Sequence, residues 1–500
     1  MYPSSPAETE VADELAAVRP DLVSGYAAAL PGARAAVLTR LWRALTHEPL
    51  PWVERRDRDG AGMTLRLRDG RRLHGPTPDP YATAAYVTTV ELGGTVHDDP
   101  ARLLTDLAVP HGGSFTAEVA HSSASLALSR AAQVPWPDEW PVTDWEWEQR
   151  VVDGHPYHPN CRARPGFSVA EQLGYAPEHR PVVQLGLVPV PAEAALVAGD
   201  WPDELRDGAR VLLPVHPWQA AHVLKRPYGG DLHGFAARPL MSLRTLALPG
   251  GPHVKTALSA RLTSSVRDIS VGSVTSSAVL SAFAQRLAER TDGLLHVTRT
   301  LGAATDGTPE LAAVLRESPR IHAGPGEQVV PVASLTTTGL TESASWLAEF
   351  ARLTLTVGMR LLDLGVALEA HGQNLLVVLD STGAPRRLVY RDLADIRVSP
   401  ERLARHGIEI SALPERILTD DVTALRRKLF GSLVAGTLAA TAGSGPALGA
   451  ALDACVRELP RTPDTGALRE TAVPAKALTL MRLTPGRTGD QWAELPNPLL

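Results

Sequence analysis

The stretch SLRTLALPGGPHVKTALSARLTSSVR, residues 242–267, places two short apolar runs on either side of a Pro/Gly turn. This pattern is typical of a hairpin, in which alternation brings polar side chains onto one face. An arginine binds phosphate or carboxylate through two parallel hydrogen bonds, a lysine adds a point charge, and hydroxyl groups complete the contacts. The side chains that would share a face are Ser242, Arg244, Lys255 and Thr263. We therefore interpret the stretch as a polyanion-binding surface rather than an ordinary solvated hairpin.

The composition is that of a globular chain large enough for more than one lobe. It has 500 residues, 44% of them hydrophobic, and no apolar run near the roughly 18 residues that cross a membrane. The net charge of -6 argues against nucleic acid as a partner, because phosphate backbones select basic surfaces. The start, MYPSSPAETEVADEL, has no basic or apolar leader segment, so we expect a cytoplasmic protein. The two cysteines, Cys161 and Cys455, are too few for a disulfide framework.

Local patterns predict several helices and strands. Residues 10–47 have helical apolar spacing, which Pro20 and Pro31 should interrupt. Residues 63–73 alternate around an Asp-Gly pair and indicate a hairpin. Residues 341–365 have the spacing of a long amphipathic helix.

Three His-Pro pairs, at His155, His158 and His216, lie in the middle of the chain. Histidine is the commonest zinc ligand, but a proline after each one rules out the regular helix on which HExxH zinc sites depend. A His-Pro step instead holds the backbone extended, and a stiff loop of this kind can direct an imidazole into a cleft. Arg162 and Arg164 follow the first two pairs and add positive charge beside them.

A polar loop, EAHGQN at residues 369–374, precedes the strand-like run 375–379, and the next strand ends at Arg391 and Asp392. Oxygen-bearing side chains at the ends of two adjacent strands suit Mg²⁺, which needs few protein ligands. The order is similar to a phosphotransferase catalytic loop followed by its metal-binding aspartate. An HGxN loop can equally be a simple turn, so the spacing alone leaves both readings open.

Taken together, these motifs resemble the IucA/IucC family of NRPS-independent siderophore synthetases, from about Glu146 to the C-terminus. The motifs that carry the resemblance are GHPYHPNCRARPGF, VHPWQ, S-x-RT…K…TSS-x-x-R, EAHGQN, the RD pair and a terminal KALTLMRL…NPL. The first ~140 residues are similar in character rather than in motif.

The resemblance implies an α+β fold shaped like a cupped hand, with thumb, fingers and a kinase-like palm that holds ATP. We expect an N-terminal helical and hairpin lobe at residues 1–145, a catalytic core at 146–400 and a C-terminal helical part at 401–500. The implied reaction uses ATP and Mg²⁺ to adenylate citrate or a citrate- or dicarboxylate-derived acid. An amine or alcohol then attacks, and the partners are these small molecules, with neither nucleic acid nor membrane. The resemblance also allows for a homodimer.

Site residues follow from the resemblance motif by motif. Those implied for ATP are His158, Ser242, Arg244, Lys255, Thr263, Arg267 and Gln373. Those implied for the acid substrate are Arg267, His371 and Lys476, and those implied for the chemistry are His371, Arg267 and Thr263. Those implied for the metal are Asn374, Asp392 and Glu369. Either His371 or His158 could be the general base.

Two positions depart from the family pattern. Arg162 stands where the family has a lysine, and Asp395 stands where a glycine is common. Two other functions stay open at this point. A kinase-like phosphotransferase would form ADP, and a nucleotide-binding protein without turnover would form neither ADP nor AMP.

Overall fold

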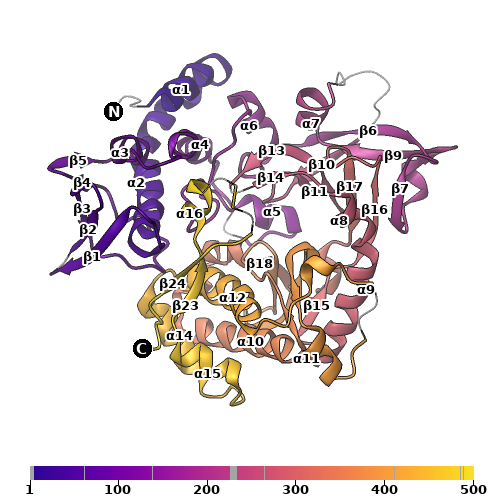
Figure 1. Cartoon of the computed structure of the whole chain (residues 1–500). Helices are drawn as coiled ribbons and strands as arrows, with labels where there is room; N and C mark the ends of the chain where they lie inside the picture. Colours follow the sequence, from indigo (N-terminus) through magenta and orange to yellow (C-terminus); the bar gives the residue numbers. More distant parts are fainter. Residues whose placement is uncertain are drawn as a thin grey trace.

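The computed structural model describes residues 5–60, 62–137, 139–225, 234–263, 265–409, 412–484, 486–487 and 489–500. The expectations that involve residues 1–4 and Ser264 lie outside the described residues. Helices and sheets are mixed along the chain, which agrees with the predicted α+β class. Figure 1 shows the N-terminal lobe at the left, the large sheet at the upper right and the helix-rich C-terminal part below.

The largest sheet has nine strands in the order β7-β16-β17-β12-β11-β10-β6-β9-β8, and neighbouring strands run antiparallel. One face packs an apolar cluster that includes Val188, Leu213 and Val254. The strands are β6 Val183–Pro191, β7 Leu196–Gly199, β8 Arg206–Asp207, β9 Arg210–Val215, β10 Phe235–Pro239, β11 Thr245–Ala247, β12 His253–Thr256, β16 Thr300–Thr305 and β17 Ala312–Arg316.

The stretch 242–267 forms two hairpins, one in the middle of this sheet and one that makes a separate two-stranded sheet. In the first, β11 and β12 pair with Thr245 opposite Lys255, and Gly250 takes a φ of 65° in the turn between them. Glycine suits this turn because a positive φ costs it little. The second hairpin pairs β13 Leu258–Leu262 with β14 Ser265–Arg267. The predicted hairpin with a Pro/Gly turn is therefore confirmed.

A four-stranded sheet of order β15-β21-β20-β18 lies against the long helix α10. Strand β20, Leu375–Leu379, is buried at every position, since alternate side chains enter two different apolar clusters. The predicted helix and strand in this region are confirmed. The other elements are α10 Ala344–Leu364, β15 Leu295–Val297, β18 Gln328–Pro331 and β21 Pro385–Tyr390.

The N-terminal lobe packs three helices and a five-stranded sheet around the long helix α2, Val23–His47. Strands β2 and β3 form the predicted hairpin, with Arg66 opposite Arg72. The remaining elements are α1 Pro6–Val18, α3 Pro100–Leu107, α4 Gly113–Ala131, β1 Val53–Asp59, β2 Gly62–Leu67, β3 Arg72–Pro76, β4 Val90–Leu92 and β5 Thr95–His97.

The helical pattern of residues 10–47 breaks at Pro20, as predicted, but the predicted break at Pro31 is wrong. Pro31 lies inside α2 with an exposed ring. An internal proline costs a helix about 3 kcal/mol. The neighbouring turns are held by buried Leu30, Ala33 and Val37, whose packing in the lobe core offsets that cost.

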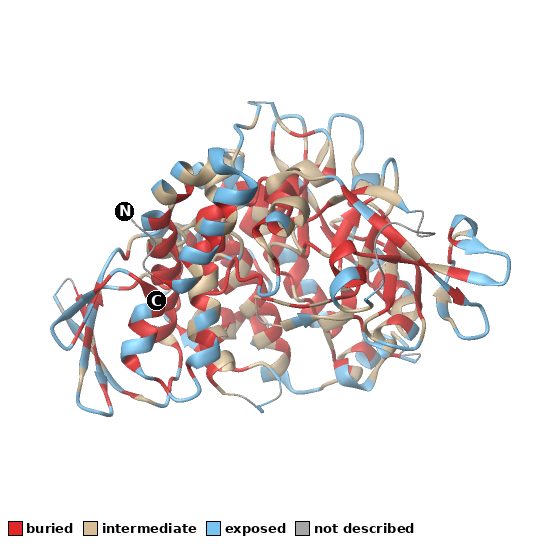
Figure 2. Ribbon diagram, turned by 90° about the horizontal axis from the view of Figure 1, so that it is seen from above, coloured by how far each residue is buried: buried red, intermediate tan, exposed pale blue. Residues whose placement is uncertain are grey.

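The C-terminal part returns to the N-terminal lobe after building its own helices. Ala477, Leu480 and Leu483 pack into the same apolar cluster as α2 and α4. Figure 2 shows the buried residues concentrated where these parts meet, with exposed residues at the hairpin tips. The C-terminal elements are α11 Pro400–Arg405, α12 Val422–Ser432, the π-helical turn Leu433–Leu438, α13 Ala439–Ala442, α14 Gly445–Val456, α15 Pro463–Glu470, β23 Val473–Lys476, α16 Leu478–Leu483 and β24 Trp492–Leu495.

Short helices connect these parts. They are α5 Asp144–Gln149, α6 Val169–Tyr175, α7 Pro217–His222, α8 Val271–Thr275 and α9 Ser277–Ala288. Within the described ranges, none of the helices combines the length and apolar character that a membrane crossing requires.

Candidate functional site

A cavity of about 850 Å³ lies where the N-terminal lobe, both larger sheets and the C-terminal segment meet. It collects every residue that the sequence singled out for ATP, substrate or metal, although these residues are spread over more than 300 positions. They are His158, Ser242, Arg244, Lys255, Thr263, Arg267, Glu369, His371, Gln373, Asn374, Asp392 and Lys476. Arg162 and Asp395, the two departures from the family pattern, line it too.

The cavity wall is strongly positive although the whole chain carries a net charge of -6. Twelve lysine and arginine side chains line it against six carboxylates. The cations are Arg40, Arg43, Arg150, Arg162, Arg164, Arg244, Lys255, Arg267, Arg316, Arg391, Lys428 and Lys476, and the carboxylates are Glu148, Asp153, Glu369, Asp392, Asp395 and Asp490. An excess of this size in one cavity suits a ligand with several negative charges.

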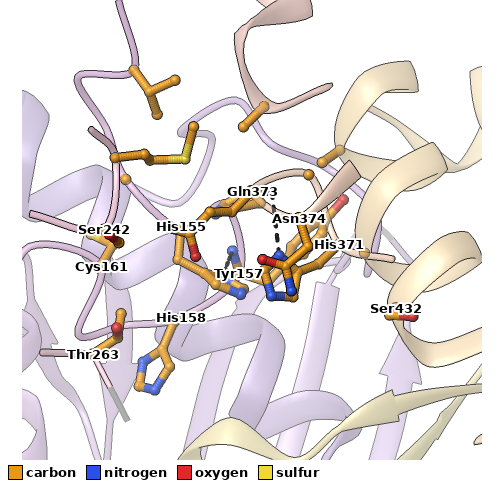
Figure 3. A pocket seen from close by; sticks show the side chains of 18 of the residues that line it. His155, Tyr157, His158, Cys161, Ser242, Thr263, His371, Gln373, Asn374 and Ser432 are labelled. Carbon is orange, nitrogen blue, oxygen red and sulfur yellow. Dashed lines mark hydrogen bonds between the residues drawn. The ribbon is translucent and has the colours of Figure 1, made fainter. Parts of the chain in front are cut away.

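The histidines of the cavity share one local geometry. In His155, His158 and His371, ring Nδ1 accepts the backbone N–H two residues further on, at 3.1, 2.9 and 3.3 Å. In the neutral ring Nε2 then carries the proton, so each imidazole offers an N–H donor. Burial lowers the pKa of His158 to about 3 and also lowers the pKa of His155 and His371, so the rings are neutral near pH 7. Figure 3 shows His155 and His371 near the centre of the pocket.

Two of the three arginines of the 242–267 stretch, Arg244 and Arg267, line the cavity and are held by backbone carbonyl groups. Arg244 donates to the carbonyl oxygens of Arg267 and Asp268, and Arg267 donates to the Leu262 carbonyl and to Thr263 Oγ1, both at 3.0 Å. Thr263 itself has a positive φ of 55°. Non-glycine residues held in this region cost free energy and tend to cluster at functional sites. The guanidinium groups are thus oriented without a carboxylate partner within 4 Å in the described part of the chain.

Lys255 and Asp392 form the clearest ion pair of the wall, with 2.6 Å between Nζ and Oδ2. Burial lowers the pKa of Lys255 to about 8, although Asp392 opposes this effect. The pKa of Asp392 is well below its usual range because Lys255, Arg316 and Arg244 outweigh its desolvation. Asp392 has a φ of 72°, which turns the chain sharply after β21.

Hydrogen bonds hold the EAHGQN loop in place from two sides. Asn374 Nδ2 donates to the Glu369 carbonyl at 3.3 Å, and Arg391 Nε donates to the Gln373 carbonyl at 3.0 Å. Arg391 also pairs with Glu148 at 2.6 Å, and both side chains are buried. From the other side, Thr437 of the π-helical turn donates to the Ala370 carbonyl at 2.5 Å. π-Helical segments are rare and frequently occur at functional sites.

Lys476 lies in a mixed network at the C-terminal edge of the cavity. Its Nζ is 2.7 Å from Glu369 Oε1 and 3.2 Å from Asp490 Oδ1. Lys428, almost fully buried, contacts the same two carboxylates and also Asp395 at 2.9 Å. Asp395 therefore extends this network. Arg162 donates hydrogen bonds to the carbonyl oxygens of Val151 and Val152, and its guanidinium group lies 3.7 Å from the Glu178 carboxylate.

The predicted metal ligands differ in how free their oxygens are. Asn374 Oδ1 and Asp392 Oδ1 have no hydrogen-bond partner among the described residues, whereas Glu369 Oε1 is shared by two lysines. One amide and one carboxylate oxygen suit Mg²⁺, which completes its shell with water and phosphate. No group of three or more His, Cys, Asp or Glu that could hold a metal occurs in the described ranges.

The sequence interpretation missed several residues of the wall. Arg40 and Arg43 come from α2, where arginines in a helical pattern look like a solvated face. Arg316 ends β17, and burial lowers its pKa to about 10. His155 was noted only as a His-Pro pair. The repeat of HP within HPYHP is a local signal that could have identified His155 as a site residue. The position of the arginines in the cavity depends on contacts with residues far along the chain, so no local signal indicates it.

Comparison with known protein families gives two matches. Residues 143–337 match the IucA / IucC family, and residues 344–491 match a group described as ferric iron reductase FhuF-like transporter. The two matches together cover the part of the chain that carries the 242–267 stretch, the EAHGQN loop and Lys476.

Several curated proteins are similar over the same part. An uncharacterized protein, y4xN, from Sinorhizobium fredii is 27% identical over 332 residues, which is 52% of this chain and 52% of that protein. A citryl-spermidine/3,4-dihydroxybenzoyl-citryl-spermidine:spermidine ligase from Bacillus anthracis is 24% identical over 311 residues, or 49% and 50%. Staphyloferrin A synthase from Staphylococcus aureus is 23% identical over 349 residues, or 58% and 59%. The similar part spans about half the length of these relatives.

Two solved structures have a similar fold along nearly the whole chain. The petrobactin biosynthesis protein AsbB from Bacillus anthracis has a TM-score of 0.75 at 18% identity, over 99% of this chain and 98% of that one. ATP-bound aerobactin synthetase IucA from Klebsiella pneumoniae has a TM-score of 0.72 at 20% identity, over 93% and 99%. At this level of identity the likeness establishes the fold.

Proposed function

Since residues 143–337 match the IucA/IucC family, we propose that the chain is a member of it and an ATP-dependent ligase of siderophore synthesis. It adenylates one carboxylate of citrate, or of a citrate- or dicarboxylate-derived acid, and releases pyrophosphate. An amine or alcohol then attacks the acyl-adenylate, which forms an amide or ester and releases AMP. Two relatives support this class of substrates by their names: one is a ligase of citryl-spermidine, or its 3,4-dihydroxybenzoyl derivative, with spermidine, and the other is a D-ornithine–citrate ligase.

The observation that carries the proposal is the excess of cations in a cavity built from both sheets. ATP and a polycarboxylate repel each other, so bringing their reacting atoms together needs dense positive charge that is already in place. A binding site for one small anion would not need twelve cationic side chains.

The phosphates of ATP bind to the cavity wall that is formed by the 242–267 stretch and the HPYHP loop. Arg244 and Arg267 supply the guanidinium groups and Lys255 the ammonium group. Ser242 and Thr263 add hydroxyl groups, and His158 adds its Nε2–H, which is buried and has no partner in the described residues. Gln373, on the facing loop, supports the nucleotide.

The acid substrate binds in the centre of the cavity. The three residues predicted to hold the acid, Arg267, His371 and Lys476, all line the cavity. In the neutral ring the Nε2–H of His371 is a donor to a carboxylate rather than a base. The same tautomer argument applies to His158 and favours anion binding over proton abstraction for both.

Asn374 and Asp392 would hold Mg²⁺, with Glu369 as a further predicted ligand through its second oxygen. A magnesium ion bound there would offset the charge on the phosphate oxygens as pyrophosphate leaves. Lys255 keeps Asp392 ionised and fixed in direction. The kinase-like palm and the division at residues 145 and 400 stay predictions.

The test is ATP–pyrophosphate exchange with purified protein, Mg²⁺ and a panel of citrate, succinyl-amines and 2-oxoglutarate. We expect exchange that depends on the acid, and AMP once an amine is added. Arg267→Ala should abolish exchange, because it removes a guanidinium that faces both anions.

Arg261→Ala is the matched control. Arg261 lies on β13 of the same hairpin and is not among the residues that line the cavity. Formation of ADP as the only nucleotide product would contradict adenylation and indicate a phosphotransferase. ATP binding without AMP or ADP across the panel would indicate a binding protein.

A further inference from the structure

Two arginines of α2 reach the cavity from the N-terminal lobe. Arg40 and Arg43 are only 5% and 6% exposed, and neither has a carboxylate within 4 Å among the described residues. All three guanidinium nitrogens of Arg40 donate to backbone carbonyl oxygens, those of Ala36, Asp153, His155 and Pro156. Arg40 therefore fixes the HPYHP loop to α2.

Arg43 differs from Arg40 because most of its donors are free. Its Nε donates to the Pro80 carbonyl at 2.6 Å, and its guanidinium carbon lies 4.4 Å from the centre of the Tyr157 ring. Its two terminal nitrogens have no acceptor in the described part of the chain, and the side chain lines the cavity. A buried cation without an anion costs several kcal/mol unless a ligand or water compensates it. The guanidinium fork is thus held in place and presented to the cavity.

Two carboxylates of this region, Glu48 and Asp79, accept hydrogen bonds from backbone N–H groups. Both Glu48 oxygens accept backbone N–H groups, those of Thr479 and Leu480 at 3.1 and 2.7 Å. Both Asp79 oxygens likewise accept backbone N–H groups, those of Tyr81 and Gly445 at 2.9 and 2.8 Å. Among the described residues, the guanidinium group of Arg43 therefore has no ion-pair partner within 4 Å in this recess.

His155 connects this recess to the proposed reaction centre. Arg43, His155 and His371 all line the same cavity. Because its Nδ1 accepts the Tyr157 N–H at 3.1 Å, its Nε2 is an N–H donor. Figure 3 shows His155 and Tyr157 beside the Gln373 and Asn374 side of the pocket. A ligand at His371 can therefore extend to Arg43 past a second donor.

We propose that Arg43, with the Nε2–H of His155, binds a second carboxylate of the acid substrate, one that is not activated. This inference rests on the proposed ligase function and deepens it. The substrate then carries at least two carboxylates, one at His371 and Arg267 and the other in the Arg43 recess. A guanidinium fork matches a carboxylate bidentately, so the recess selects against monocarboxylic acids and against cationic amines.

The first experiment measures binding without turnover. Citrate and ATP are each titrated into the wild-type full-length protein and into Arg43→Met by calorimetry. We expect citrate affinity to fall about 10- to 100-fold in Arg43→Met, since a hydrogen bond to a charged group is typically worth that factor. ATP affinity should stay within about twofold. Methionine keeps an unbranched apolar side chain without the charge, and the thermal midpoint checks that the variant is folded.

Two further variants sharpen the result. Arg43→Lys keeps the charge but loses the fork, so citrate affinity should lie between those of the wild type and Arg43→Met. His155→Asn should weaken citrate by about threefold to tenfold, as expected for one neutral hydrogen bond. Arg102→Met removes an exposed arginine of the same lobe and is the charge control. It should bind citrate as the wild type does.

The inference would be overturned if Arg43→Met and Arg43→Lys bound citrate as tightly as the wild type. It would also be overturned if the wild type bound no citrate. The proposed function has a separate readout. If the wild type bound citrate but formed no AMP with any acid, the ligase proposal would fail while the calorimetry still decided the role of Arg43. In the active enzyme, Arg43→Met should raise the KM for citrate and leave the KM for ATP unchanged.

Discussion

Lys255 and Asp392 belong to different sheets and meet across the cavity, with 2.6 Å between Nζ and Oδ2. Lys255 lies on β12 of the nine-stranded sheet, and Asp392 follows β21 of the four-stranded sheet. The pair links the proposed phosphate wall to the proposed metal ligand. Its geometry therefore fixes the two sheets relative to each other at the point where ATP would bind.

We expect Lys255→Met to weaken ATP binding in the presence of Mg²⁺ by about tenfold or more. A hydrogen bond to a charged group contributes about 1.5–3 kcal/mol, and the variant also leaves Asp392 without its ammonium partner. Calorimetric titration with ATP measures the effect. Lys255→Arg keeps the charge and should lose less. Wild-type affinity in Lys255→Met would show that this lysine does not contact the nucleotide.

A second ion pair, Glu148 with Arg391, positions the EAHGQN loop. The two side chains are 1% and 3% exposed and lie 2.6 Å apart. Glu148 also accepts the Met241 N–H at 2.9 Å, next to the 242–267 stretch. The pair thus joins α5, the 242–267 stretch and the loop that carries His371.

Glu148→Ala should lower the free energy of unfolding by about 3–5 kcal/mol, because Arg391 would stay buried without its counter-charge. Urea unfolding followed by tryptophan fluorescence measures the change. Glu148→Gln keeps an acceptor for Met241 and should cost less. Equal urea midpoints for Glu148→Ala and the wild type would mean that water replaces the carboxylate at no cost.

Much of the site could be predicted because its signals are local. The Pro/Gly turn after Leu248, the apolar run 375–379 and the His-Pro steps each act over a few residues, and the structure confirms the hairpin and the strand. Turn chemistry and strand alternation do not depend on the rest of the chain.

The residues that were missed depend on contacts across the chain. Arg43 is buried by Pro80 and Tyr157, which lie 37 and 114 positions away, so its helix gives no sign of a cavity. Glu369 was predicted only as a metal ligand, yet Lys428 and Lys476 share its Oε1. Pro31 failed as a helix breaker for the same reason, since tertiary packing outweighed a local preference.

Gly154 opens the HPYHP loop with a φ of 71°, and a Cβ there would lie 2.4 Å from the Cys161 carbonyl oxygen. Gly154→Ala should therefore lower stability by about 1–3 kcal/mol and displace His155 and His158. We expect weaker binding of both citrate and ATP, measured by calorimetry.

Gly174→Ala is the matched control for Gly154→Ala. Gly174 lies in helix α6, where a Cβ would meet no atom within 4 Å, so alanine should leave stability unchanged or raise it slightly. Wild-type stability and ligand affinity in Gly154→Ala would show that the loop tolerates a different backbone path.

His216, the third His-Pro histidine, is fully buried outside the cavity. Its Nδ1 accepts the Trp218 N–H at 3.2 Å and caps α7, while its Nε2 has no partner among the described residues. Burial lowers its pKa from 6.5 to about 3. The unfolded chain therefore takes up a proton below pH 6.5 that the folded chain refuses.

The stability that neutral His216 contributes is complete above pH 6.5 and is lost as the pH falls from 6.5 toward 3. At pH 5 the loss is about 2 kcal/mol, or 1.36 kcal/mol per pH unit. His216→Asn keeps a capping acceptor for the Trp218 N–H but does not titrate. We expect urea unfolding at pH 7.5 and pH 5 to show that this variant loses about 2 kcal/mol less than the wild type. His111→Asn, which removes an exposed imidazole, should keep the wild-type pH dependence. An equal loss in His216→Asn and the wild type would mean that His216 takes up its proton in the folded state.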